Sequence, residues 1–178
     1  MKSLIAMTCL CLCVVALLGS ASAQEMINFA NLPLVKTPSP VPDGYGRLAW
    51  SNFYYVNARL WSGSGPGDLL GPQGEDIAFI GNRDCRLIGD ACYGILTNAH
   101  GLVLMSATVA ASFGPTHLTV MAYNNGKYLG SAGYFLTTQL QTLRFPSSWG
   151  VATEVVFQVT GEPDSLAVYT LEVFTLGG

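Results

Sequence analysis

An alternating stretch that runs into an Asn-Asn-Gly turn constrains the fold of this chain most strongly. Between residues 117 and 124, Leu118, Val120 and Ala122 alternate with Thr119, Met121 and Tyr123, and the turn 124–126 with the sequence Asn-Asn-Gly follows at once. Alternation places successive side chains on opposite faces of a strand. Asn-Gly readily takes the positive backbone angles of a type I′ turn. The pattern predicts a β-hairpin made of strands 117–124 and 127–137.

Other short runs rich in Val, Ile, Thr, Tyr and Phe have the composition of half-buried strands. No segment has a convincing 3.6-residue period, and we assign the stretch 105–112 to a strand because it is apolar on every face. The sequence therefore predicts an all-β fold, an antiparallel two-sheet β-sandwich. The remaining strands are expected at 52–59, 76–81, 101–113, 140–145, 151–160 and 166–176.

The first 23 residues have the pattern of a secretory signal peptide. Lys2 precedes an apolar run over 4–18, and Ala21-Ser22-Ala23 forms a small-x-small cleavage site. The run is shorter than the roughly 20 residues that span a bilayer. We therefore expect cleavage after Ala23, no retained membrane anchor and an extracellular protein.

The remainder of the chain is expected to form an arm and one domain. Residues 24–44 contain four prolines, which fix backbone angles and remove amide donors. This stretch is predicted to be an extended N-terminal arm without a helix or an interior strand. Residues 45–178 are predicted to form the β-sandwich domain.

The composition excludes some classes of partner. Charged residues make up 11% of the chain, against about 25% in an average soluble protein. The 8 Lys and Arg residues do not exceed the 11 Asp and Glu residues, so nothing favours binding to nucleic acid.

Two cysteines lie beyond the predicted signal peptide. In an oxidising compartment, Cys85 and Cys92 are expected to form one disulfide that closes a short loop. The alternative is a metal or redox pair, which is weak because no histidine lies nearby at ligand spacing.

One histidine segment invites comparison with an enzyme. The stretch 94–100, which ends in Leu-Thr-Asn-Ala-His100, resembles the histidine segment of trypsin-like proteases. Those enzymes also need a later Gly-x-Ser-Gly turn, which is absent after His100. His100 and His117 are the whole histidine inventory, too few for a three-histidine zinc site. We expect His117 to be exposed or at a strand edge, with no metal site and no cofactor, although a mixed site with carboxylates stays open.

Carboxylates offer an alternative, catalytic hypothesis. Glycoside hydrolases use two carboxyl groups that face one another across a cleft. The possible members of such a pair are Glu75, Asp76, Glu154, Glu162, Asp164 and Glu172.

Aromatic residues beside Gly, Asn or Ser are candidates for sugar stacking. We expect Trp50 and Phe53 to pack in the core. Tyr123 and Tyr128 stand at the predicted hairpin tip, and Trp149 lies in a Pro-Ser-Ser-Trp-Gly loop. These three residues are the predicted ligand-binding residues.

Four stretches carry a family resemblance, namely Pro42-x-Gly44-Tyr45-x-x-Leu48-x-Trp50-x-Asn52-Phe53, Leu118-Thr119-Val120 to Tyr123-x-x-Gly126, Thr142-Leu143-x-Phe145 and Tyr169-Thr170-Leu171-Glu172-x-Phe174. They resemble small secreted jelly-roll proteins of the galactose-binding-like type, which are frequent in fungi. The resemblance implies a jelly roll and a role in binding carbohydrate or other extracellular partners. Such domains often have an aspartate in the last strand near a calcium ion, whereas this chain has Glu172, so we expect no calcium site.

The sequence hypothesis is a secreted, non-catalytic, effector-like protein. It would act by binding a glycan or protein of a host or a cell wall. A partner protein would require a sizeable exposed apolar patch, and a secreted glycan-active hydrolase using a carboxylate pair is the alternative.

Overall fold

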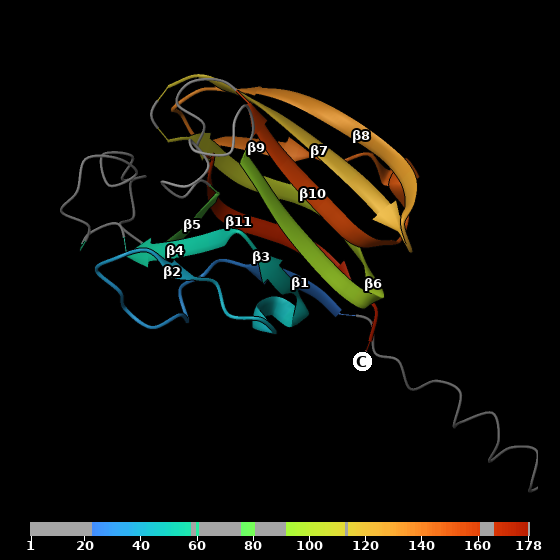
Figure 1. The fold of residues 1–178 in the computed structure, drawn as a ribbon, viewed down its shortest axis with the longest axis horizontal. Coiled ribbons are helices and arrows are strands. Elements are labelled where there is room, and N and C mark those ends of the chain that lie inside the picture. The colour runs from blue at the N-terminus through green and yellow to red at the C-terminus, as the bar shows by residue number, and fades with distance from the viewer. Residues whose placement is uncertain are drawn as a thin grey trace, which may run out of the picture.

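The structure, a computed structural model, is almost entirely β-strand and antiparallel (Figure 1). It describes residues 23–57, 60, 76–80, 92–112, 114–160 and 166–177. Within these ranges the helical elements are two single 3-10 turns, Tyr45–Arg47 (η1) and Ser147–Trp149 (η4). No helix in the described residues is long and apolar enough to cross a membrane. The predicted all-β antiparallel class is confirmed.

Eleven strands are found in the described residues, and most of the predicted ones are among them. Their hydrogen-bonded order is β2-β4-β5-β11-β6-β10-β7-β8, with β1 also paired to β11 and both β3 and β9 paired to β6. The strands are β1 (Ala23–Ile27), β2 (Ser39–Pro40), β3 (Ala49–Ser51), β4 (Phe53–Asn57), β5 (Asp76–Ile80), β6 (Cys92–Ala111), β7 (Thr116–Asn124), β8 (Lys127–Leu136), β9 (Gln141–Arg144), β10 (Ala152–Thr160) and β11 (Leu166–Thr175).

Strand β6 joins the whole sheet because it is 20 residues long. Its first part pairs with β10 and β3, and its second part pairs with β11 and β9. In Figure 1 it runs diagonally between the group β7, β8 and β10 and the group β1 to β4. Hydrogen bonding therefore links all eleven described strands into one sheet, and the predicted division into two separate sheets is not seen in the strand pairing.

The sheet folds back on itself around an aromatic core. Phe53 of β4 contacts Phe157 of β10 with ring centroids 5.8 Å apart, although three strands separate β4 from β10 in the sheet order. Trp50 packs edge-on against Phe53 at 5.2 Å, and Phe145 contacts Phe157 at 6.4 Å. Trp50 and Phe53 are buried, as predicted.

The segment 24–44 is extended but belongs to the folded domain. It contains β1 and β2, each of which pairs with a single neighbour among the described strands. Edge strands tolerate proline, which explains Pro40 in β2. Phe29, Leu32 and Val41 lie in the main core cluster, so packing extends the domain beyond its predicted start at residue 45.

The predicted hairpin is confirmed, and its two strands supply most residues of the candidate site. β7 pairs with β8, and the turn residues Asn125 and Gly126 have φ of 49° and 77°. Positive φ at both positions is the requirement of a type I′ turn. A register shift between Ala122 and Tyr123 leaves one extra residue on β8, which is a β-bulge.

The predicted disulfide stays a prediction. Cys92 is buried at the start of β6. Its expected partner, Cys85, lies outside the described residues.

Candidate functional site

Strand register gives β8, β7, β10 and the start of β6 a common outer face. Leu118, Val120 and Phe157 point into the core and are fully buried. Their neighbours in sequence therefore point the other way. The antiparallel pairs place these outward residues in adjacent rows, for example Tyr93, Gln158, Thr119 and Gly133.

We call this surface the outer face and define it by these residues. Tyrosines and uncharged polar residues dominate it, and Glu154 is its single acidic side chain. The outer face comprises Tyr128, Ser131, Gly133 and Phe135 on β8, His117, Thr119, Met121 and Tyr123 on β7, Glu154, Val156, Gln158 and Thr160 on β10, and Tyr93, Ile95 and Thr97 on β6.

Two of the three predicted site residues come together on the outer face. Tyr123 and Tyr128 are cross-strand partners, and their ring centroids are 5.6 Å apart with an interplanar angle of 60°. Tyr128 is 53% exposed, whereas Tyr123 is half-buried. The Tyr123 hydroxyl donates to Met121 Sδ at 3.6 Å. This contact fixes one edge of the pair.

The third predicted residue, Trp149, is not on the surface. It is buried in η4, and its ring stacks on Phe145 with centroids 6.0 Å apart. A Cβ added at Gly130 of β8 would lie 2.7 Å from Trp149 Nε1. Our expectation of a surface ring was wrong because the indole turns inward under the hairpin, although its backbone neighbours are typical of a loop.

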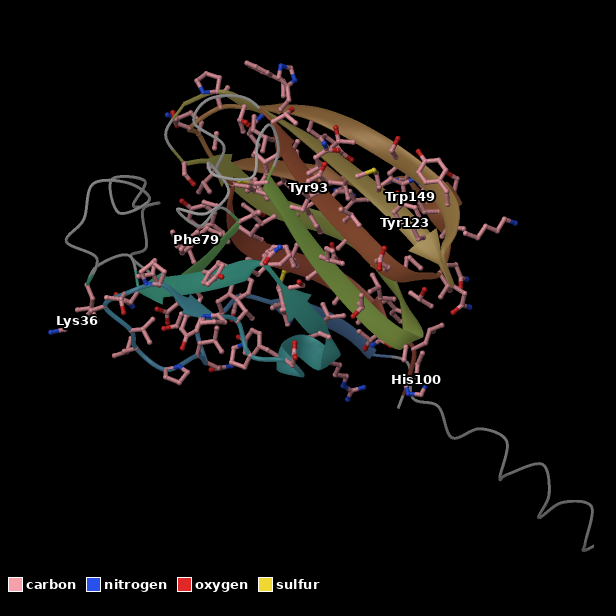
Figure 2. All side chains as sticks on the ribbon, in the orientation of Figure 1. Lys36, Phe79, Tyr93, His100, Tyr123 and Trp149 are labelled. Atoms are coloured by element: carbon pink, nitrogen blue, oxygen red, sulfur yellow. The ribbon has the colours of Figure 1, made fainter. Side chains whose placement is uncertain are left out.

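A third surface tyrosine, Tyr93 on β6, was missed by the sequence analysis. It is 43% exposed, and Gln158 Nε2 donates to its hydroxyl at 3.2 Å. Figure 2 shows Tyr93 and Tyr123 on the same group of strands, with Lys36 and His100 far from both. The alternation over 92–97 is the signal that would have revealed Tyr93, because Cys92 and Leu96 are buried on the opposite side.

The far end of the outer face carries a second aromatic contact. His117 lies edge-on to Phe135 of β8, with ring centroids 5.2 Å apart. Phe135 is 57% exposed, and His117 is exposed as predicted. His117 and Tyr123 stand six residues apart on β7, so the two aromatic groups occupy opposite ends of the strand.

The half-buried phenol of Tyr134 supports β8 from the inner side. The Tyr134 hydroxyl donates to the carbonyl oxygen of Arg144 at 2.8 Å. Burial raises the pKa of Tyr134 above its ordinary value, so the group stays protonated at neutral pH. Its ring packs edge-on against Phe145, which in turn stacks on Trp149.

The carboxylates are dispersed over the described residues. Glu154 pairs with Thr97 and Tyr123, whereas Glu172 on β11 accepts hydrogen bonds from Gln24 at 2.9 Å and Ser106 at 2.7 Å. Asp76 is buried at the start of β5. Within the described residues no three His, Cys, Asp or Glu side chains gather as a metal site would require. Glu75, Glu162 and Asp164 lie outside the described residues.

The protease-like segment has a structural role in β6. Asn98 Oδ1 accepts hydrogen bonds from the backbone amides of His100 at 2.8 Å and Gly101 at 3.1 Å. Its Nδ2 donates to the Arg47 carbonyl at 3.0 Å. The asparagine therefore shapes the backbone near the middle of β6 and ties it to η1.

Comparisons with known proteins support the fold. No family model matches the sequence, and a search of curated proteins found no match. A DUF4465 family protein from Bacteroides caccae is 13% identical, with a TM-score of 0.54 over 90% of this chain and 95% of that chain. At this identity the likeness shows the fold alone.

Two weaker likenesses are to sugar-binding domains. The lectin binding domain of lectinolysin, complexed with Lewis b, is 10% identical with a TM-score of 0.39 over 55% of this chain and 70% of that chain. TmCBM61, complexed with β-1,4-galactotriose, is 12% identical with a TM-score of 0.38 over 71% and 86%. Neither likeness is close enough to carry an argument about this chain.

Proposed function

We propose that this protein binds a glycan through its outer face and acts without catalysis. The observation that carries the proposal is the Tyr123–Tyr128 pair, in which Tyr128 is exposed and Tyr123 half-buried, beside Glu154 on a face with few charges. Tyr93 and its hydrogen-bonded neighbour Gln158 extend the same surface onto β6.

The chemistry of these side chains suits a sugar. One face of a pyranose ring presents C–H groups that pack on an aromatic ring, while its rim presents hydroxyl groups that need hydrogen-bond partners. Tyrosine offers a large, rigid contact area at low cost in conformational entropy. A carboxylate and a carboxamide on the same face offer acceptors and donors, and hydrogen bonds to a carboxylate are the stronger ones.

Two rival functions are less well supported. The large exposed apolar side chains in the described residues come from several elements, including Met26 on β1, Met105 on β6 and Phe135 on β8. This distribution favours a glycan over a protein partner. Glu154 and Glu172 have different strand partners and do not face one another across the sheet, which favours binding over hydrolysis.

We further propose that the protein is secreted and effector-like and that its ligand belongs to a host or a cell wall. The apolar run and the Ala-x-Ala site support secretion. An oxidising compartment would allow the disulfide between Cys85 and Cys92. The antiparallel strands and the folded sheet support a sandwich of the jelly-roll type.

A glycan array tests the proposed function. We expect the purified protein to bind a restricted set of glycans and Tyr128→Ala to lose that signal. Met26→Ala removes an exposed apolar side chain on β1, away from the outer face, and serves as the matched control. An array without signal above background for the wild-type protein would contradict the proposal, as would a signal that Tyr128→Ala leaves intact.

A further inference from the structure

The three surface tyrosines define a diagonal path across the outer face. Tyr93 is the partner of Gln158, Gln158 is the partner of Thr119, and Tyr123 lies four residues beyond Thr119 on β7. Strands lie about 4.8 Å apart and rise about 3.4 Å per residue, so Tyr93 and Tyr123 are separated by about 17 Å between Cα atoms. One monosaccharide cannot span this distance, whereas a chain of linked sugars can.

The charged side chain along this path is a carboxylate, that of Glu154. Glu154 lies between Thr97 and Tyr123 in the sheet, next to the tyrosine pair. The outer-face residues between Tyr93 and the pair are otherwise uncharged, namely Gln158, Thr119, Val156 and Met121. A ligand that stacks on Tyr123 therefore meets a carboxylate at its edge.

Among the described residues, no lysine or arginine shares the outer face with that carboxylate. The described lysine or arginine on β6, β7, β8 or β10 is Lys127, and its strand partner is Asn124 instead of an outer-face residue. Of the two histidines, His117 stands six residues from Tyr123 at the other end of β7, and His100 is far from Tyr123 in Figure 2. Arg144 lies on β9 and Arg47 in η1. Lys36 is far from Tyr123 in Figure 2.

We propose that the outer face takes a linear, neutral oligosaccharide along this path and that Glu154 discriminates against chains that contain uronic acids. The inference rests on the proposed glycan binding and adds the ligand class. Glu154 accepts hydrogen bonds from the hydroxyl groups of a neutral sugar, and such charge-assisted bonds are the strong ones. A second carboxylate in the same place would meet like charge, which is how binding surfaces exclude wrong partners.

Calorimetric titration with matched oligosaccharides tests this specificity. The probes are hexasaccharides of β-1,4-linked glucose, mannose and xylose, their monosaccharides, and an oligogalacturonate of equal length. We expect the protein to bind at least one neutral hexasaccharide about tenfold or more tightly than its monosaccharide and than the oligogalacturonate. Equal or tighter binding of the oligogalacturonate overturns the proposal. Binding of a monosaccharide as tight as that of its hexasaccharide also overturns it.

Two substitutions test whether Glu154 causes the preference for neutral over acidic oligosaccharides. Glu154→Gln keeps the size of the side chain and is expected to reduce the ratio of neutral to acidic affinity by about tenfold. Glu25→Gln on β1 removes an equal charge away from the outer face and is expected to leave the ratio unchanged. An unchanged ratio in Glu154→Gln contradicts the proposal, provided that circular dichroism shows the variant to be folded.

Salt gives a readout that misfolding cannot imitate. Repulsion between Glu154 and an acidic chain is screened by added salt. Oligogalacturonate binding to the wild-type protein should therefore strengthen with salt, and binding to Glu154→Gln should strengthen less, because only the overall negative charge of the protein then remains to be screened. No binding of any glycan, here or on the array, would refute the proposed function itself. Binding without discrimination would refute only this inference.

Discussion

Tyr123 and Tyr128 are cross-strand partners at the end of the β7–β8 hairpin, with ring centroids 5.6 Å apart. The Asn125-Gly126 turn sets their register, and the bulge after Ala122 brings them opposite one another. Trp149 supports the same hairpin from its inner side, close to Gly130. The pair is therefore positioned by a turn, a bulge and a buried indole.

Because the two rings touch, their contributions to glycan binding should be coupled. Tyr123→Ala and Tyr128→Ala are each expected to weaken binding about tenfold or more, and the double variant should lose less than the sum of the two free-energy changes. Calorimetry on the wild-type protein and the three variants measures this coupling. Strict additivity would mean that the rings do not act as one platform.

Trp149 should matter for stability and not for ligand contact. Trp149→Ala is expected to lower the free energy of unfolding by about 3–5 kcal/mol, because it leaves a cavity beside Phe145. Trp149→Phe should cost less because it keeps a ring in place. Denaturant unfolding measures both effects. If Trp149→Ala kept its stability but no longer bound a glycan, Trp149 would be a ligand-contacting residue and this prediction would be wrong.

Gly94 is required by close packing in the core. A Cβ at this position would lie 2.6 Å from Ile80 Cδ1 and 2.7 Å from Phe53 Cε2. Gly94→Ala should therefore destabilise the protein by about 1–3 kcal/mol through overpacking. Gly133→Ala on β8 is the matched control, since a Cβ there has nothing within 4 Å. Equal melting temperatures for the two variants would contradict this packing.

Two half-buried phenols, those of Tyr45 and Tyr134, should make stability fall at alkaline pH. Burial raises the pKa of both Tyr45 and Tyr134, so each binds its proton more tightly in the folded protein. Their contribution is complete below the unfolded value of about 10 and is lost as the pH rises above it. Unfolding measured at pH 8 and pH 11 should show the loss. Tyr134→Phe should lose less of its free energy of unfolding between these two pH values. A loss equal to that of the wild-type protein would contradict the role of Tyr134.

Secretion predicts a defined N-terminus on β1. Cleavage after Ala23 would make Gln24 the first residue, and its Nε2 donates to Glu172 Oε1 at 2.9 Å. N-terminal glutamine cyclises when its α-amino nitrogen attacks Cδ and Nε2 leaves as ammonia. The intact mass of protein recovered from a secreting host should correspond to residues 24–178 less one ammonia and, with the proposed Cys85–Cys92 disulfide formed, less two hydrogen atoms. A mass that includes the first 23 residues would contradict cleavage.

Local sequence patterns predicted the strands and the hairpin, but they did not predict where every aromatic ring lies. Alternation and the Asn-Gly turn predicted β7 and β8 closely, because both signals act between neighbours in the chain. The burial of Trp149 depends on Phe145 and on the absence of a side chain at Gly130. The local sequence Pro-Ser-Ser-Trp-Gly does not indicate such contacts between strands.

The proline-rich segment and the start of β6 show the same limit. Phe29 packs against Tyr45 and Trp50, and Phe29 and Val41 belong to a core cluster whose members extend as far as β11. Tyr93 lies in a short alternating run at the start of β6. It becomes part of a surface together with Gln158 and Tyr123, which lie on other strands. Register between distant strands decides which surface tyrosines share a face.

The most direct test of the account is a map of the ligand on the outer face. Backbone amide NMR spectra of the labelled protein, titrated with a glycan that binds on the array, should shift around Tyr93, Tyr123, Tyr128 and Gln158. Residues of β1 and β11, such as Met26 and Glu172, should stay unchanged. Saturable shifts confined to the residues on β1 and β11, with the outer face unaffected, would contradict the central claim.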